Sequence, residues 1–132
     1  VKQRGVAMLM WADRFIDAKV FKYGSWEASM NGTAPALDKV PKDIIMCDWH
    51  YEPRETYPSV PMFLKKGFRV LPAGWKKVDA TQALIQYSRA QAHANMLGHL
   101  FTTWSGPKDW TEFPPLLEGL KLLRPSIEPA NK

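Results

Sequence analysis

The sequence has only one cysteine, Cys47, and three histidines among its 132 residues. A single thiol excludes an internal disulfide and a cysteine-rich zinc site. His50, His93 and His99 have no spacing typical of a metal site, so we expect neither a metal nor a cofactor. The glycines are dispersed and form no phosphate-binding loop, dinucleotide fingerprint or nucleophile elbow. These absences disfavour nucleotide-dependent enzymes and serine hydrolases of the common types.

Long apolar runs are also missing, since no stretch of about 18 uninterrupted apolar residues occurs. We therefore expect no membrane-spanning segment. Residues 1–4 contain no methionine and precede no apolar signal segment, which predicts a chain cut from a longer protein. The net charge is +5, but the basic residues are scattered, which favours a solvated surface over a nucleic-acid track. The sequence does not indicate a cellular compartment.

Short apolar runs recur along the chain and alternate with helical patterns. The apolar runs cover residues 6–11, 44–49, 68–72 and 100–104. The helical patterns cover residues 33–38, 59–67, 79–97 and 114–124. The first two runs are nearly continuous in apolar character, which is typical of parallel strands covered on both faces. One connection is unusually long, residues 12–32, and a connection of that length is typical of a functional or mobile loop.

The order of these patterns predicts an α/β fold with a parallel sheet. A complete (β/α)8 TIM barrel needs roughly 250 residues, so four βα units are half of one. We therefore predict a single domain, residues 1–132, in which four βα units form half of a (β/α)8 TIM barrel. An open, doubly wound sheet is the alternative that this length also allows. Because a half-barrel leaves edge strands and an apolar inner face uncovered, we expect self-association or pairing with an N-terminal half-barrel.

Tryptophans mark the ends of the predicted strands, at Trp11, Trp49, Trp75 and Trp104. Polar or hydroxylated side chains lie beside them, namely Asp13, Asp48, His50 and Tyr51. The carboxyl ends of parallel strands share one edge of a sheet, where α/β proteins bind ligands. An indole can cover the apolar face of a sugar while carboxylate, imidazole and hydroxyl groups bond its rim. We predict a carbohydrate site of these eight residues; the plainer interpretation is that the tryptophans belong to the core.

Three segments carry a resemblance to a known family: residues 8–13, 41–51 and 98–105. They resemble the second half of glycoside hydrolase family 20, the β-N-acetylhexosaminidases, and in particular its hexosaminidase D-like branch. The resemblance implies the C-terminal half-barrel of a larger glycosidase catalytic domain, acting on terminal β-linked N-acetylhexosamine. It implies that the walls of the sugar subsite include Trp11, Asp13, Trp49 and Trp104, with Tyr51 and Trp75 as looser matches.

The catalytic groups that the resemblance implies are not in this sequence. The family uses the acetamido oxygen of its substrate as the nucleophile, assisted by an adjacent Asp-Glu pair at an earlier strand end. No Asp-Glu dipeptide occurs here, which implies that the catalytic acid lies upstream of Val1 and that this fragment alone is inactive. In addition, residues 105–107 are Ser-Gly-Pro, where family members often carry an acidic residue. The competing hypothesis is a self-contained α/β ligand-binding module without catalytic activity.

Overall fold

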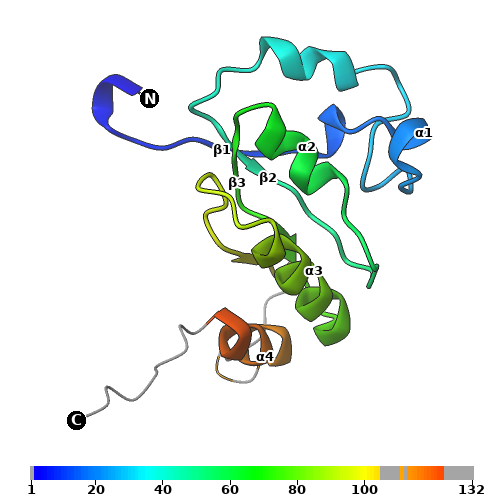
Figure 1. The fold of residues 1–132 in the computed structure, drawn as a ribbon, viewed down its shortest axis with the longest axis vertical. Helices are drawn as coiled ribbons and strands as arrows, with labels where there is room; N and C mark the ends of the chain where they lie inside the picture. Colours follow the sequence, from blue (N-terminus) through cyan, green and yellow to red (C-terminus); the bar gives the residue numbers. More distant parts are fainter. Residues whose placement is uncertain (1, 105–110, 112, 124–132) are drawn as a thin grey trace.

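The computed structural model describes residues 2–104, 111 and 113–123 (Figure 1). Its strands are β1 (Leu9–Trp11), β2 (Ile45–Cys47), β3 (Arg69–Val70), β4 (Ala73–Gly74) and β5 (Leu100–Phe101). Its α-helices are α1 (Ala18–Phe21), α2 (Ser59–Lys65), α3 (Val78–Ala90) and α4 (Pro114–Leu123). Short 3-10 turns are η1 (Lys2–Arg4), η2 (Asp13–Phe15) and η3 (Ala34–Lys39). The predictions that involved Val1, residues 105–107 and Arg124 fall outside the described residues.

The strands run parallel wherever the described residues pair. β1 pairs with β2, β2 with β3, and β4 with β5. Two isolated parallel bridges connect these pairs, one between Trp49 and Ala73 and one between Val70 and Met96. Neighbours in the sheet are therefore also neighbours along the chain. The prediction of an α/β fold with parallel strands is confirmed.

The third apolar run contains β3 and ends at Pro72, which has no backbone N–H to donate, and β4 follows directly after it. Hydrogen bonds continue on both sides of that proline. Leu71 N donates to Met46 O at 2.9 Å, and Ala73 N donates to Asp48 O at 2.9 Å. β3 and β4 are thus two parts of one extended segment that lies beside β2 and its continuation.

The helix predicted over residues 79–97 ends at Ala90. Its apolar spacing continues beyond that point, but Ala92 takes a left-handed conformation with φ 46° and turns the chain. The chain then returns to the sheet, where Asn95 O accepts a hydrogen bond of 2.8 Å from Val70 N. Pairing with the sheet therefore overrides the helical pattern of the last residues.

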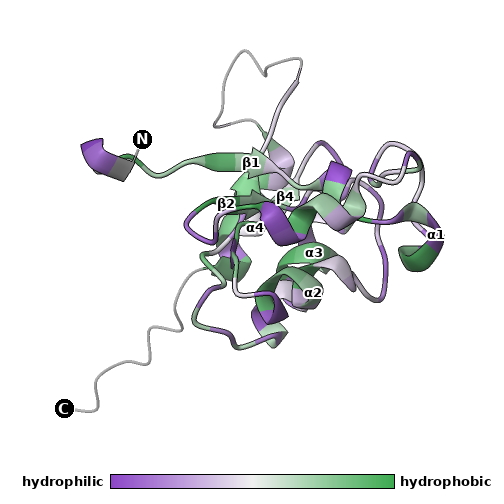
Figure 2. Ribbon diagram, turned by 90° about the horizontal axis from the view of Figure 1, so that it is seen from above, coloured by the Kyte–Doolittle hydropathy of each residue, from purple (hydrophilic) through white to green (hydrophobic). Residues whose placement is uncertain are grey.

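The core lies between the sheet and helices α2 and α3, which Figure 2 shows together on one side of β1, β2 and β4. Met46 and Val70 contribute to it from the strands, and Phe63 and Leu84 from the helices. Successive strand residues face opposite sides of a sheet. On β1 the residues next to the half-buried Met10 are exposed, with Leu9 at 48%. The face of β1 that points away from the helices is therefore left open to solvent.

Helix α4 packs mainly against α3 through a small residue. A Cβ atom placed on Gly119 would lie 2.5 Å from the Phe101 ring and 3.0 Å from Ile85 Cδ1, so only glycine allows this approach. Leu117 and Leu120 of this helix are exposed, although the apolar spacing of residues 114–124 favours an inward position for both. No helix among the described residues is long and apolar enough to cross a membrane.

Candidate functional site

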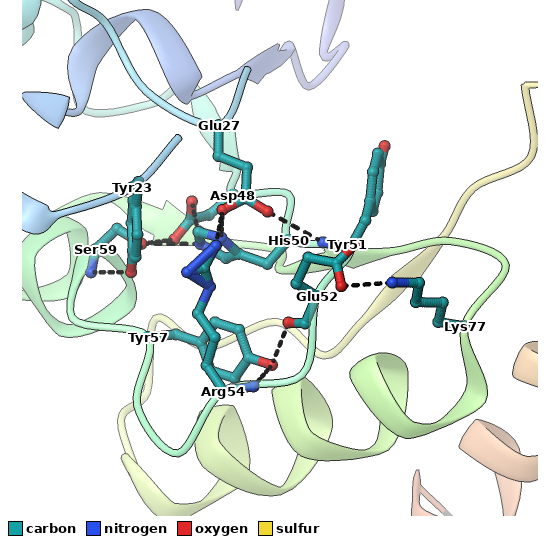
Figure 3. A network of polar contacts seen from close by, with 10 residues as sticks. All are labelled: Tyr23, Glu27, Asp48, His50, Tyr51, Glu52, Arg54, Tyr57, Ser59 and Lys77. Carbon is teal, nitrogen blue, oxygen red and sulfur yellow. Dashed lines mark hydrogen bonds and ion pairs between the residues drawn. The ribbon is translucent and has the colours of Figure 1, made fainter. Parts of the chain in front are cut away.

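The segment that continues β2 presents two different sides. His50 N donates to Ala73 O at 3.0 Å, which keeps the chain extended past the end of β2. In an extended chain, alternate side chains point to opposite faces. Trp49 and Tyr51 accordingly lie on one side, and Asp48 and His50 on the other. Figure 3 shows the Tyr51 ring directed away from the polar groups around His50.

On the first side, aromatic rings gather around Tyr51. The Tyr51 ring centroid lies 4.7 Å from that of Trp49 and 5.3 Å from that of Trp75. The Tyr51 hydroxyl accepts a hydrogen bond of 2.9 Å from Trp104 Nε1. Trp104 in turn lies 5.6 Å from Trp11 between ring centroids, with the planes tilted by 44°. These five residues are called the aromatic cluster below.

The members of the aromatic cluster come from all parts of the sheet. Trp11 ends β1, and Trp104 follows β5, the strands at the two extremes of the chain order. Three strand spacings separate such strands by roughly 14 Å, so both indoles must lean across the same face to touch. Trp11 is 40% exposed and Trp104 is 61% exposed. The pair therefore presents open indole surface at the carboxyl ends of the strands.

One carboxylate joins the aromatic cluster from the beginning of η2. Asp13 Oδ1 accepts a hydrogen bond of 3.3 Å from Trp49 Nε1. Its other oxygen, Oδ2, forms an ion pair with Arg14 Nε. A carboxylate has about four lone-pair sites, so acceptor capacity is left for a ligand hydroxyl.

Trp75 has a supporting position within the aromatic cluster. One neighbour is Tyr51, and the ammonium group of Lys76 lies 4.3 Å from the Trp75 ring centroid. A cation over an indole face is an attractive contact that occupies that face. Trp75 is half-buried, so it offers less free ring surface than Trp11 or Trp104.

On the opposite side of the segment lies a network of buried polar groups (Figure 3). His50 Nε2 is 3.0 Å from Ser59 Oγ and 3.1 Å from Asp48 Oδ1, while His50 Nδ1 is 3.4 Å from Glu27 Oε2. Ser59 Oγ donates to Asp48 Oδ2 at 2.6 Å. The members of this buried network are Tyr23, Glu27, Asp48, His50, Arg54, Tyr57 and Ser59.

Two predicted site residues lie apart from the aromatic cluster. Asp48 and His50 are both 0% exposed and lie on the helix side of the sheet. The backbone of the strand separates both side chains from the aromatic cluster. The structure brings together the other six predicted residues, Trp11, Asp13, Trp49, Tyr51, Trp75 and Trp104.

Charged neighbours shift the pKa values of His50 and Glu27 in the buried network. Burial alone lowers the pKa of His50, but the Asp48 and Glu27 carboxylates outweigh it and raise that pKa to about 9. Burial alone raises the pKa of Glu27, but His50 and Arg54 outweigh it and hold that pKa below its usual value. At neutral pH the network thus contains an imidazolium ion between carboxylates.

Ser59, His50 and Glu27 have the connectivity of a hydrolase triad, yet they cannot act as one. A general base must be neutral to accept the proton of the serine, and His50 is already protonated at neutral pH. The Ser59 hydroxyl donates to Asp48 instead. Ser59 and His50 are also 0% exposed. The arrangement of the buried network therefore fits a structural role.

Sequence reasoning missed Tyr23, Glu27, Arg54, Tyr57 and Ser59. Glu27 lies in the connection of residues 12–32, which holds η2 and α1 and is closed by a bridge between Asp17 and Ser29. The unusual length of that connection was the one signal that pointed to it. Buried polar residues far apart in the sequence leave no periodic pattern, so their pairing could not be predicted.

One cleft among the described residues lies apart from this site. A cleft of about 450 Å³ lies at the amino-terminal ends of β1 and β2, lined by residues that include Val6, Met8, Ile44 and Arg69. It is at the opposite end of the strands from the aromatic cluster. Within the described ranges, no group of three or more histidine, cysteine, aspartate or glutamate side chains is placed to hold a metal ion.

No protein-family model matches this sequence, and no curated protein matches it significantly. The resemblance of the three segments to family 20 glycoside hydrolases therefore stays a prediction.

Proposed function

We propose that the aromatic cluster and Asp13 form one wall of a subsite for terminal β-linked N-acetylhexosamine in a glycoside hydrolase. The observation that supports this most is the gathering of four indoles and a tyrosine ring, from separate strand ends, beside a carboxylate. The carboxyl edge of a parallel sheet is also where α/β enzymes bind their substrates.

Trp11 and Trp104 are the members that stack on the sugar. Their exposed rings, 5.6 Å apart and tilted by 44°, form an open angle that accepts the flat CH face of a pyranose. Asp13 accepts a hydrogen bond from a ring hydroxyl, and the Tyr51 hydroxyl, already an acceptor from Trp104, donates to the ligand. Covering roughly 100 Å² of apolar surface contributes about 2.5 kcal/mol. A millimolar Kd needs about 4.1 kcal/mol beyond the entropic cost of association, so the hydrogen bonds of Asp13 and Tyr51 must supply the rest and we expect an affinity no tighter than millimolar.

The architecture that we propose is half of a (β/α)8 barrel. The sequential order of the parallel strands supports it, because a doubly wound sheet reverses its strand order at a switch point. The placement of α2 and α3 on one face, with Leu9 exposed on the other, is also what an opened barrel would have. In a whole barrel this exposed face is the packed interior.

We propose that this open face is covered by a second half-barrel. For the 132-residue chain by itself, the partner is a second copy, with β1 of each copy against β5 of the other, which closes an eight-stranded ring by two-fold symmetry. In a longer protein, an N-terminal half with the Asp-Glu pair takes that place and supplies catalysis. Sedimentation at low micromolar concentration tests the first arrangement: a dimer is expected, and a well-behaved monomer contradicts it.

Ligand titration tests the subsite. Tryptophan fluorescence of the chain is expected to change saturably with N-acetylglucosamine, and Trp11→Ala or Trp104→Ala to weaken the affinity about tenfold or more. Trp26→Ala is the matched control, because Trp26 is 82% exposed and has no ring contact with the cluster residues. Equal affinity in all three variants would refute the subsite. Saturable binding of a different ligand class, with no response to N-acetylhexosamine, would favour a ligand-binding module instead.

A further inference from the structure

The connection between β1 and β2 delivers a carboxylate to the interior. Ser29 N donates to Ile16 O at 2.7 Å, and Ala18 N donates to Ser29 O at 2.9 Å, so the two ends of residues 16–29 are tied together. Glu27 lies inside this closed segment and is buried. A buried carboxylate is costly unless its oxygens are paired, so its partners are informative.

Within the described structure, every group that pairs with the Glu27 carboxylate belongs to one short turn, residues 50–54. Oε1 accepts a hydrogen bond of 3.4 Å from Tyr51 N. Oε2 accepts one of 2.6 Å from Arg54 Nη2 and lies 3.4 Å from His50 Nδ1. One carboxylate therefore ties together a backbone amide, a guanidinium and an imidazolium from the same turn.

Tyr51 connects this turn to the aromatic cluster. Its backbone N–H points to Glu27, while its ring lies between Trp49 and Trp75 and its hydroxyl accepts from Trp104. The rings of Trp49, Trp75 and Trp104 thus share contact with one residue. Any displacement of the Tyr51 backbone moves the acceptor of the Trp104 indole.

We propose that Glu27 is a positioning residue for the aromatic cluster: its buried carboxylate fixes the turn of residues 50–54 and, through Tyr51, the orientation of Trp104. The inference deepens the sugar subsite proposed above and rests on it for its functional meaning. Glu27 itself does not touch the ligand, because it lies on the helix side of the extended segment.

A carboxylate is required for this role. The three donors face both oxygens, so a glutamine would aim its NH₂ group either at Tyr51 N–H or at Arg54 and His50. In either orientation the glutamine NH₂ group faces another hydrogen-bond donor, so at least one hydrogen bond is lost. An aspartate keeps the charge, but its side chain is one CH₂ group shorter and cannot hold Tyr51 N and Arg54 at the same time.

The test reads Trp104 directly, by hydrogen exchange of the tryptophan indole N–H groups in NMR spectra of the full chain. In the wild type, the Trp104 indole N–H is expected to exchange more slowly than that of the exposed Trp26. Glu27→Gln is expected to speed Trp104 exchange about fivefold to tenfold, as loss of one hydrogen bond does, with Trp26 unchanged. Tyr51→Phe removes the acceptor and is expected to give the same increase.

Glu52→Gln is the matched control. Glu52 belongs to the same turn but is exposed and pairs with Lys77, so its substitution is expected to leave Trp104 exchange at the wild-type rate. The double variant Glu27→Gln with Tyr51→Phe is expected to exchange no faster than Tyr51→Phe alone, because both act on the same hydrogen bond. A merely stabilising role for Glu27 would lower the melting temperature without altering Trp104 exchange well below it.

Two outcomes overturn the proposal: a Trp104 indole as fast as Trp26 in the wild type, or a folded Glu27→Gln protein with wild-type Trp104 exchange. If Glu27→Gln does not fold, Arg54→Met is the substitute, because it removes one partner of the Glu27 carboxylate. We expect it to speed Trp104 exchange by a smaller factor. No change in Trp104 exchange in this variant would contradict the proposal. Because exchange is measured without sugar, failure of sugar binding refutes the subsite alone. Unchanged exchange with intact sugar binding refutes the positioning role alone.

Discussion

The aromatic cluster and the buried network are built on the two sides of the same four residues, 48–51, yet they differ in every physical respect. The aromatic cluster is open, with Trp104 exposed, and consists of rings and one carboxylate at its edge. The buried network is largely closed to solvent, with Arg54 as its one partly exposed member, and has paired charges around His50. The comparison teaches that adjacent residues of one strand can serve a ligand and the fold separately, because each side chain points away from the next.

The largest expected effect is a loss of stability caused by a substitution in the buried network. His50→Ala removes the cation that lies between Asp48 and Glu27 and leaves buried carboxylates without that partner. Breaking one partner of a buried ion pair costs about 3–5 kcal/mol, which urea unfolding would measure. Trp104→Ala, on the open side, is expected to cost about 1 kcal/mol or less. Similar losses in the two variants would contradict the division of roles.

The pH dependence of stability sharpens the same contrast. Folding raises the pKa of His50 from 6.5 to about 9, so the stabilisation is fully present below pH 6.5 and is lost as pH rises through 9. The free energy of unfolding is expected to fall by about 3 kcal/mol between pH 6.5 and pH 9. Thermal unfolding curves recorded at each pH would measure this fall. His50→Asn should flatten the profile. A wild-type profile that is already flat between pH 6.5 and 9 would show that His50 is not held as a cation.

A moderate effect on ligand affinity is expected from substituting Asp13, the carboxylate at the edge of the aromatic cluster. Asp13→Asn keeps an acceptor for Trp49 Nε1 but removes the charge that strengthens a hydrogen bond to a sugar hydroxyl. Affinity for N-acetylglucosamine is expected to fall about fivefold, by fluorescence titration, with a change in stability below about 1 kcal/mol. An unchanged affinity would remove Asp13 from the subsite while leaving the stacking surface in place.

The smallest effect is expected from the exposed ion pair of Lys77 with Glu52. Lys77 Nζ and Glu52 Oε2 lie 2.5 Å apart, but both side chains are exposed, and such pairs contribute at most about 1 kcal/mol. Lys77→Met is expected to leave both the free energy of unfolding and sugar affinity within experimental error. A loss as large as that of His50→Ala would mean that this turn depends on its surface charges.

The parallel sheet could be predicted from the sequence, because a run such as residues 44–47 is apolar throughout, which is typical of a strand covered on both faces. The end of α3 could not, since the apolar spacing continues to Leu97 while pairing of Met96 with β3 ends the helix earlier. The apolar spacing of a segment indicates only which local structure that segment favours. It does not show that a distant strand will pair with the end of the segment and stop the helix.

The candidate site was predictable in the same uneven way. Tryptophans at strand ends predicted a shared edge, and the ring contacts of Trp11 with Trp104 show that these two rings meet. Asp48 and His50 were assigned to the same edge although the alternation of an extended chain places them opposite Trp49. Glu27 was missed because its partners are more than 20 residues away and depend on how the long connection folds.

The most direct measurement is an NMR titration of the chain with N-acetylglucosamine, observed at the tryptophan indole signals. Carbohydrate stacking at the strand ends predicts saturable shifts of the Trp11 and Trp104 signals at millimolar sugar, with the Trp26 signal unmoved. Signals of Trp11 and Trp104 that stay in place, or move only as far as that of Trp26, would contradict it.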